Sequence, residues 1–531
     1  MGEIDAHECL DQIPIIDLFA GPGGLGEGFA RYPIETKKRF KVVLSIEKDP
    51  DAHKTLTLRA FFRQFDQSSV PLEYYQYLRG ETTKEALFDS FPVQATAAQD
   101  EARLLELGKE DPHELIRRKL RGSERWVLIG GPPCQAYSLV GRSKMLGDIK
   151  RNPGESLEQF NLRRTKAFDK DHRHQLYRHY LEIIAMHWPS IFVMENVRGI
   201  LSAKHNGERI FPKILRDLGS PADVFPGSGR KHEYRIYSLT TPPNRSPIEQ
   251  DPADFLIRSE LYGVPQARHR VILVGVRDDF DSGQIPLLQT CEPRTVRQSI
   301  GDLPNLTSGV SKANGLIPYH ALSSLSYEDL HEGANGASID AKLEKLIRKV
   351  IRNAHRSEQR GSVFLPNDDV SCDVWYHDPR LGGVCNHETR RHIKEDLWRY
   401  VFASCYAEHY GVSPQLRDFP KALLPNHANV MEAIEGQKFG DRFRVQVADK
   451  PSSTITSHIS KDGHYFIHYD PLQYRSLTVR EAARLQTFPD NYFFEGNRTS
   501  QYHQVGNAVP PLLAYYIAGI VDELFGRIKT Q

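Results

Sequence analysis

Short apolar runs bounded by turn residues recur through the first half of the chain. They cover 13–19, 41–47, 126–131, 191–195 and 271–276. Runs this short, rich in Val and Ile, are typical of buried strands, and the segments between them show the apolar spacing of helices. The alternation predicts an α/β fold with a doubly wound, Rossmann-like sheet whose ligands bind at the carboxyl ends of its strands.

The rest of the chain departs from this alternation in two places. The segment 61–125 is long for a connection between strands, and we expect an insertion on the edge of the sheet, with LFDSF and EARLLELG as helical pieces. Residues 306–443 lack the alternation and are rich in Asn, His, Asp and Gly, which indicates a separate lobe. The expected organisation is a main domain over 13–305, the lobe over 306–443, and a C-terminal segment, 444–531, that returns to the main domain.

Local signals mark two helix starts in the C-terminal segment. Thr478 precedes the run VREAARLQTF, and Glu481 follows three positions later, which predicts a capping box. Pro510 and Pro511 suit the first turn of a terminal helix.

Composition indicates an ordinary globular protein. The 531 residues are 39% hydrophobic and 26% charged, and they exceed the usual size of one compact core. We find no apolar run of 18 or more residues and no signal-peptide pattern, so we expect a cytoplasmic protein without a membrane anchor. The net charge of +1 does not itself indicate nucleic acid, although basic stretches at 113–125, 141–152 and 161–179 permit a DNA-binding face.

A glycine-rich loop follows the first strand and precedes a helix. Gly21, Gly23 and Gly26 fit the pattern G-x-G-x-x-G, and Glu47 ends the next strand. Glycines let a ligand approach the backbone closely, and a carboxylate at this place can accept hydrogen bonds from both ribose hydroxyls. The pattern indicates a cofactor that contains a nucleoside, although a glycine turn that only packs a helix on a strand would look the same.

Two features favour S-adenosylmethionine over NAD as this cofactor. Asp17 and Phe19 place an acid and an aromatic ring at the end of the strand. Pro22 stiffens the loop, which suits a ligand without a pyrophosphate. A nicotinamide-dependent oxidoreductase stays open as an alternative enzyme class.

Cys134 stands in the turn Gly-Gly-Pro-Pro-Cys-Gln after the third apolar run. The chain has six cysteines and no CxxC pair, so neither a zinc site nor a disulfide framework is indicated, and no metal is expected. A single cysteine is usually an inert buried residue. Its position on a loop at the carboxyl end of a strand favours a nucleophile.

Charged side chains lie at the ends of the next two strands. Glu195 closes the fourth apolar run, either as a helix cap or as a functional acid in the same crevice. Arg268 and Arg270 precede the fifth run at alternate positions and therefore point the same way, which suits a clamp on an anion or a carbonyl oxygen.

The order of these motifs resembles that of the cytosine-5 DNA methyltransferase family. The chain carries FAGPGGLGEGF, IEKDP, GGPPCQAYS, MENVRG, YGVPQARHR, REAARLQTFPDNY and QVGNAVPP in this succession. The resemblance covers about 13–277 and 441–520, and agreement of several independent motifs in order is highly specific. It implies a stand-alone modification enzyme of the bacterial or phage type, with an S-adenosylmethionine-dependent methyltransferase domain and a target-recognition lobe over 306–443.

The resemblance also implies a role for each candidate catalytic residue. Cys134 looks like the nucleophile that adds to C6 of cytosine and activates C5 towards the methyl group. Glu195 would hydrogen-bond and protonate N3 of the base. Arg270 would hold O2, and Arg268 would lie near the cysteine or the backbone.

The family's cofactor and DNA contacts match further positions. Contacts to S-adenosylmethionine match Asp17, Phe19, Gly21, Gly23, Gly24, Glu47, Lys48, Pro132, Asn507 and Ala508. Contacts to DNA match Gln135, Ser138 and Arg142, in a basic loop over 135–170 that would close on the opened duplex. The acid that contacts adenine in the family has no assignable counterpart, and Lys48 stands where the family often has an aromatic or apolar residue.

The implied substrate is cytosine in double-stranded DNA. Its reacting atom lies inside the stacked duplex, so the base must be flipped out. A companion restriction endonuclease fits a modification enzyme, and we expect a monomer. Two alternatives stay open: a tRNA-directed relative, whose shorter members carry a Cys-Phe-Thr signature not found here, and a non-catalytic DNA-binding relative, which would not need Cys134 or Glu195.

Replacing Cys134 tests the assignment of the nucleophile. Cys134→Ser should lower methyl transfer by roughly 10³-fold or more, because a hydroxyl is a far weaker nucleophile than a thiolate. Binding of S-adenosylmethionine should persist in calorimetry, and Cys291→Ser serves as the control. Substantial transfer of labelled methyl groups to DNA by Cys134→Ser contradicts the assignment.

Overall fold

The computed structural model describes most of the chain. The described residues are 12–33, 37–133, 156, 159–160, 172–205, 208–229, 232–242, 250–281, 283–311, 322, 330, 333–334, 339–354, 359–367, 373–426, 430–434, 440–461 and 463–527.

The main sheet has eight strands in the order β3-β2-β1-β4-β5-β11-β8, and β9 pairs with β11. The strands are β1 (Ile13–Leu18), β2 (Phe40–Glu47), β3 (Ala102–Leu104), β4 (Val127–Gly130), β5 (Ile191–Val197), β8 (Tyr234–Tyr237), β9 (Leu256–Arg258) and β11 (His269–Arg277). Neighbours from β3 to β5 are parallel, whereas β11 is antiparallel to β5, β8 and β9. The Rossmann-like α/β fold is confirmed, and each of the five apolar runs forms a strand of this sheet.

The sequence pattern misses three strands of this sheet: β3, β8 and β9. The helix expected over EARLLELG is wrong, because Ala102–Leu104 form β3 and turn residues follow. A strand of three residues is too short to show a hydrophobic period. Its pairing with β2 therefore decides its conformation.

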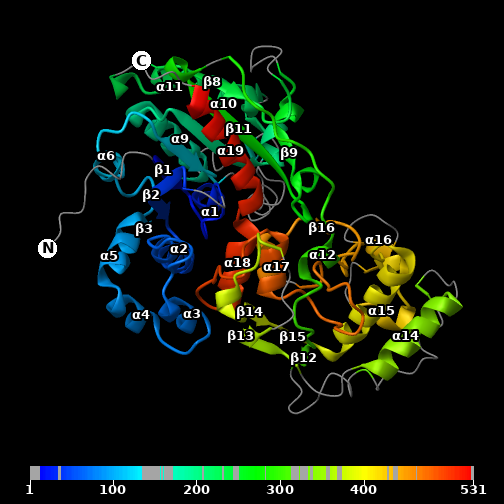
Figure 1. Cartoon of the computed structure of the whole chain (residues 1–531). Coiled ribbons are helices and arrows are strands. Elements are labelled where there is room, and N and C mark those ends of the chain that lie inside the picture. The colour runs from blue at the N-terminus through cyan, green and yellow to red at the C-terminus, as the bar shows by residue number, and fades with distance from the viewer. Residues whose placement is uncertain are drawn as a thin grey trace.

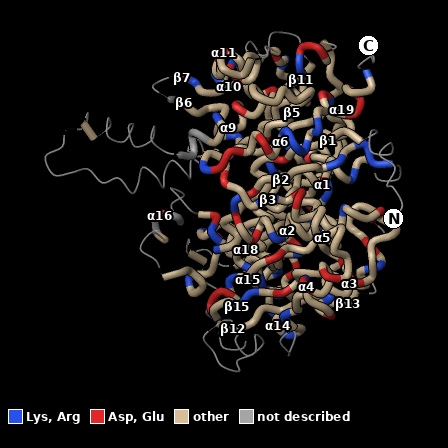
Figure 2. The backbone as a smooth tube through the Cα atoms, turned by 90° about the vertical axis from the view of Figure 1, so that its left-hand side faces the viewer, with Lys and Arg blue, Asp and Glu red and all other residues tan. Residues whose placement is uncertain are grey.

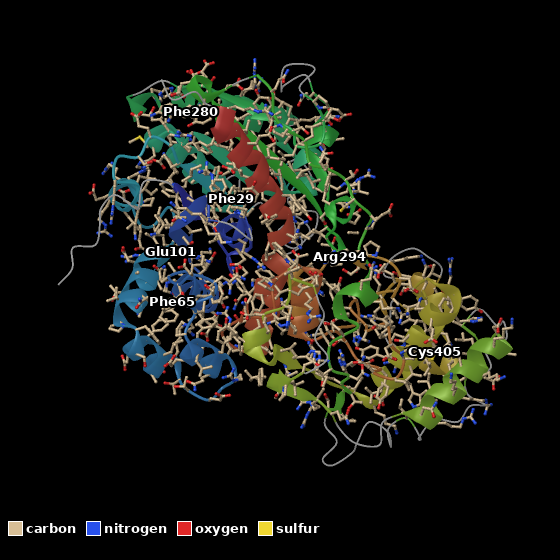
Figure 3. The ribbon with its side chains drawn as sticks, in the orientation of Figure 1. Phe29, Phe65, Glu101, Phe280, Arg294 and Cys405 are labelled. Atoms are coloured by element: carbon tan, nitrogen blue, oxygen red, sulfur yellow. The ribbon has the colours of Figure 1, made fainter. Side chains whose placement is uncertain are left out.

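Helices cover both faces of the sheet (Figure 1). One face packs on α1 (Gly24–Arg31) and α19 (Pro511–Arg527), and the other on α6 (His113–Leu120), α9 (His172–His187) and α10 (Ile210–Gly219). Side chains of β1 alternate between the two cores, with Ile15 in the first and Ile16 in the second. Figure 3 shows Phe29 of α1 at the centre of the first core, where it is fully buried.

Four helices form a group beside the β3 edge of the sheet. They are α2 (Pro50–Phe62), α3 (Leu72–Leu78), α4 (Lys84–Ser90) and α5 (Pro92–Glu101). Their aromatic core includes Phe61 and Tyr74 and takes Leu381 and Cys385 from the lobe. Part of the predicted insertion therefore packs against both the sheet and the lobe, and Figure 3 shows Phe65 and Glu101 in this group.

The lobe lies across the molecule from the sheet, around α14–α16 (Figure 1). Its elements include α14 (Ala341–Asn353), β13 (Gly361–Pro366), β14 (Gly383–Glu388), β15 (Arg391–His392), α15 (Lys394–Tyr410) and α16 (Val430–Ile434). The strands β13 and β14 pair antiparallel. The core between α14 and α15 also takes Val445, Ile467 and Tyr474 from the next part of the chain.

The C-terminal segment runs from the lobe back to the sheet through α17 (Val479–Leu485), α18 (Arg498–Asn507) and α19. The capping box is confirmed: Thr478 Oγ1 accepts from the Glu481 amide, and Glu481 accepts from the Thr478 amide. The helix α19 begins at Pro511, as predicted. The helical run Arg498–Arg527 is long and apolar enough to cross a membrane, but 72% of its most apolar window is buried inside the fold, as in the core helix of a soluble protein.

Close packing of α1 on α19 generates a stability prediction. A Cβ on Gly28 would collide with Ala514 and with the backbone of Pro511. Gly28→Ala should therefore lower the free energy of unfolding by about 1–3 kcal/mol through overpacking. Gly526→Ala is the control, because it lies in α19 with no described atom within 4 Å of its Cβ position; it should stabilise by up to about 1 kcal/mol. Equal midpoints of Gly28→Ala and wild type in urea unfolding would contradict the packing argument.

Candidate active site

The glycine loop between β1 and α1 has a backbone that few residues could adopt. Phe19 has a φ of 56°, unusual for a residue with a side chain, and Gly21 and Gly23 have φ values of 57° and 93°. A Cβ on Gly23 would lie 2.8 Å from Leu56, whereas one on Gly21 would meet no described atom within 4 Å. The loop is therefore tightly packed at Gly23 and open at Gly21.

Glu47 holds the open side of this loop in place. Its Oε2 accepts a hydrogen bond of 2.8 Å from the Gly21 amide, and its Oε1 accepts from the amides of Lys48 and Asp49. The carboxylate thus stands beside the open face of the glycine loop, at the carboxyl end of β2. The Lys48 side chain is mostly exposed, with its Nζ 3.6 Å from Glu106.

The unpredicted strand β3 adds residues to the same edge. Leu104 pairs with Glu47, is 51% exposed, and is followed two positions later by Glu106. The sequence pattern predicts a helix where β3 lies, so it assigns no residue to this edge.

Asp17 lies beneath the loop and does not face an open surface. Its side chain is 1% exposed, and neither carboxylate oxygen has a hydrogen-bond partner among the described residues. A Cβ on Gly26, in the first turn of α1, would lie 3.0 Å from its Oδ2. Burial raises the pKa of Asp17 to about 8, against the opposing charge of Arg63.

The C-terminal segment meets the glycine loop from the other side. A Cβ on Gly24 would collide with the carbonyl oxygen of Val509. Ala508 is buried at the end of α18, and the Asn507 side chain is exposed, 3.2 Å from His503. Val509 of this segment therefore lies directly against the start of α1.

An ion pair occupies the carboxyl end of β5. Arg270 Nε lies 2.8 Å from Glu195 Oε1, and both side chains are mostly buried, at 15% and 14% exposure. The strands β5 and β11 pair Ile272 with Glu195, so Arg270, two residues earlier in β11, lies on the same face as the carboxylate. A Cβ on Gly131 would lie 2.8 Å from Glu195 Oε2, so the loop after β4 passes directly over this carboxylate.

The expected nucleophile follows this loop. Pro132 is buried, and Pro133 is described as well. Cys134, Gln135, Ser138 and Arg142 lie outside the described residues. The structure therefore brings the chain to a point three residues before Cys134, in contact with Glu195.

The three cysteines that the structure describes differ from the expected nucleophile in burial or in position. Cys385 and Cys405 are buried, and burial raises the pKa of Cys385 to about 12. Cys405 lies in the lobe, far from the sheet (Figure 3). Cys291 is exposed, and its amide donates to the Leu261 carbonyl.

Arg268 does not share the environment of Arg270. Its guanidinium is fully buried and donates to the carbonyl oxygens of Ile455, at 2.8 Å, and Gly506, at 3.2 Å. Burial and the nearby charge of Arg270 lower its pKa. The arginine clamp expected from alternate positions is divided: Arg270 pairs with Glu195, and Arg268 fastens the C-terminal segment to the sheet.

Gln266 also fastens the C-terminal segment to the sheet, a role that the sequence pattern did not predict. Its Nε2 donates to the Leu485 carbonyl at 3.1 Å, and its Oε1 accepts from the Ile455 amide at 2.8 Å. Gln266 stands two residues before Arg268 in the motif YGVPQARHR, and this position is the sequence signal that could have indicated its role.

The buried carboxyl of Asp17 generates a pH-dependent stability prediction. Its pKa of about 8 lies above its unfolded value of about 4, so the folded protein keeps a proton that the unfolded chain releases between these values. The stability of the wild type relative to Asp17→Asn should therefore fall as the pH rises from about 4 to about 8. We expect the Tm of Asp17→Asn to gain several degrees on the wild type between pH 5 and pH 8, measured by calorimetry. Asp89→Asn, an exposed control, should show no such trend, and a constant Tm difference for Asp17→Asn would refute the protonated state.

Comparison with known proteins agrees with the motifs assembled at this edge. The family model described as C-5 cytosine-specific DNA methylase matches residues 158–221 and 255–522. The type II methyltransferase M.Bpa9945I of Bacillus paralicheniformis is 33% identical, over 96% of this chain and 98% of the relative. M.DdeI of Desulfomicrobium norvegicum, also a type II methyltransferase, is 25% identical over 97% and 90%. The DNA (cytosine-5-)-methyltransferase M.ApeKI of Aeropyrum pernix is 26% identical over 77% and 83%. This chain belongs to the C-5 cytosine-specific DNA methylase family.

Proposed function

We propose that this DNA (cytosine-5-)-methyltransferase moves a methyl group from S-adenosylmethionine to C5 of a flipped-out cytosine, through a covalent bond between Cys134 and C6. The observation that carries the proposal is the contact between Gly131 and the Glu195–Arg270 ion pair, three residues before Cys134. A thiol placed beside this ion pair would lie near a carboxyl group and a guanidinium at one edge of the sheet.

The open side of the glycine loop fits the cofactor. Glu47, at the end of β2, is placed to accept from ribose hydroxyls beside the open position at Gly21. Phe19, Gly23, Gly24, Pro132, Asn507 and Ala508 would complete the pocket, and Lys48, Leu104 and Glu106 would flank its outer wall. S-adenosylmethionine supplies an electrophilic methyl group when it is bound.

Asp17 has a supporting role in this proposal. Its buried carboxyl lies under the first turn of α1, so it would hold the shape of the loop and would not touch the ligand. A neutral carboxyl there avoids a buried negative charge.

The nucleophilic step uses the residues around Glu195. The thiolate of Cys134 would form a bond to C6 of the cytosine, while N3 gains a proton from the Glu195 carboxyl, so that C5 becomes an enamine carbon. After C5 has taken the methyl group, a base would remove the C5 proton, the thiolate would leave C6 and the N3 proton would return to Glu195, which restores the aromatic ring and the acid. Arg270 would keep Glu195 in position and hold O2 of the base.

Arg268 would be a positioning residue. Its hydrogen bonds to Ile455 and Gly506 fix the C-terminal segment, which in turn carries Asn507 to the cofactor loop. Its buried guanidinium would thereby couple the edge of the base pocket to the cofactor pocket.

Double-stranded DNA would lie between the sheet edge and the lobe. The domain proposal keeps 13–305 as the catalytic domain, 306–443 as the target-recognition lobe and 444–531 as the returning segment. The loop over 135–170, with Gln135, Ser138 and Arg142, would contact the opened duplex. The relatives named as type II methyltransferases support a companion endonuclease for the same site, and we propose a monomer that acts on DNA in the cytoplasm.

Glu195→Gln tests the acid in this mechanism. The amide keeps the shape of the side chain but cannot supply a proton to N3, so kcat for methyl transfer should fall by about 10²–10⁴-fold while DNA binding stays near wild type. The assay follows labelled methyl groups from S-adenosylmethionine to plasmid DNA and, separately, to tRNA. Glu260→Gln, which removes the charge of the carboxylate that lies 2.9 Å from His269 Nε2, is the matched control. Wild-type kcat in Glu195→Gln would exclude this role, and transfer to tRNA alone would replace DNA as the substrate.

A further inference from the structure

A cavity of about 500 Å³ opens between the lobe and the C-terminal segment. Its wall carries Arg360, Arg390, Arg391 and Arg498, with Glu388 as the one carboxylate among the residues that line it. We call this cavity the arginine pocket. None of these residues takes part in the mechanism above.

The pocket carries an excess of positive charge. Glu388 Oε1 accepts from Arg360 at 2.9 Å and lies 3.4 Å from Arg498, so one carboxylate serves two guanidiniums. Within the described part of the chain, no carboxylate lies within 4.0 Å of Arg390 or Arg391. Beside them, burial and the charge of Arg390 lower the pKa of His392 to about 3.

The arginines are held in place from both walls. Arg390 donates to the Ile459 carbonyl, and its guanidinium lies 4.0 Å from the centre of the Tyr502 ring. Arg498, in the first turn of α18, donates to the Thr389 carbonyl at 2.7 Å. A ligand with several acceptor oxygens would therefore find guanidiniums that are already oriented, which lowers the entropy cost of binding.

The pocket lies at the opposite end of α18 from the carbonyl that binds Arg268. The helix α18 runs from Arg498 to Gly506, whose carbonyl accepts from Arg268, and this is a rise of roughly 12 Å. That length corresponds to about three or four base steps of duplex DNA. In Figure 2, α18, α15 and β15 lie on the same side of the molecule.

We propose that the arginine pocket binds a phosphodiester of the DNA backbone a few steps from the flipped base. The inference rests on the proposed function, because it takes DNA as the substrate. Phosphate oxygens would replace water at Arg391 and at the hydroxyl of Ser460, which also lines the pocket. Because the walls come from the lobe and from the C-terminal segment, one phosphate would fix the two against each other.

Two substitutions with opposite expected effects test the pocket. Arg391→Ala removes an exposed guanidinium, so affinity for a random duplex of about 30 base pairs should fall several-fold in low salt, and the slope of log K against log salt should become less steep by about one. Glu388→Gln removes the one carboxylate among the described residues that line the pocket and should tighten binding of the same duplex. Lys349→Ala, an exposed charge on α14, is the matched control and should leave the slope unchanged.

The outcomes separate this inference from the proposed function. Unchanged duplex affinity and salt slope in both Arg391→Ala and Glu388→Gln overturn the inference, even if the wild type methylates DNA. Opposite shifts in the two variants support the pocket, and absence of methyl transfer by the same wild-type preparation would then count against the proposed function alone. Stabilisation of the wild type by inorganic phosphate that Arg391→Ala loses, with unchanged duplex binding, would assign the pocket to a free anion and overturn the inference.

Discussion

The buried guanidinium of Arg268 is the constraint on which the arrangement of the site depends. It donates to backbone carbonyls of Ile455 and Gly506, which belong to two separate stretches of the C-terminal segment. Buried carbonyl groups need partners, so this one side chain fixes both stretches against the sheet. From Gly506 the chain continues to Val509, whose carbonyl lies against Gly24. The C-terminal segment thereby packs on the Gly24 side of the glycine loop. The proposed base pocket and the proposed cofactor pocket would therefore share one support.

A second group of buried arginines holds the lobe to this segment. Arg480 donates to the carbonyls of Cys385, Pro489 and Tyr492, and Arg484 pairs with Asp490 at 2.7 Å. Arg480 and Arg484 belong to the motif REAARLQTFPDNY, and they donate to backbone carbonyls and to the buried carboxylate of Asp490. The motif thus joins the β13–β14 hairpin to the loop after α17. Buried pairs of this kind add little net stability, but they restrict the packed segments to one relative geometry.

Charge is arranged differently in the two parts of the proposed interface. At the sheet edge, Glu195 and Arg270 compensate each other in a mostly buried pair. In the arginine pocket, one carboxylate, that of Glu388, faces four guanidiniums among the described residues. The first arrangement suits a neutral base, and the second suits a phosphate. The overall charge of +1 conceals this division.

The sequence alone determined the features that depend on neighbouring residues. The five apolar runs, the glycine loop and the capping box at Thr478 follow from hydrophobic periods and turn chemistry within a few positions, and the structure has each of them. Tertiary structure decided what depends on distant partners. The strand β3 exists because β2 offers an edge, and the different tasks of Arg268 and Arg270 follow from partners such as Gly506, 238 positions away. A local pattern can place a charge on one side of a strand, but only the folded chain brings the group that charge will bind.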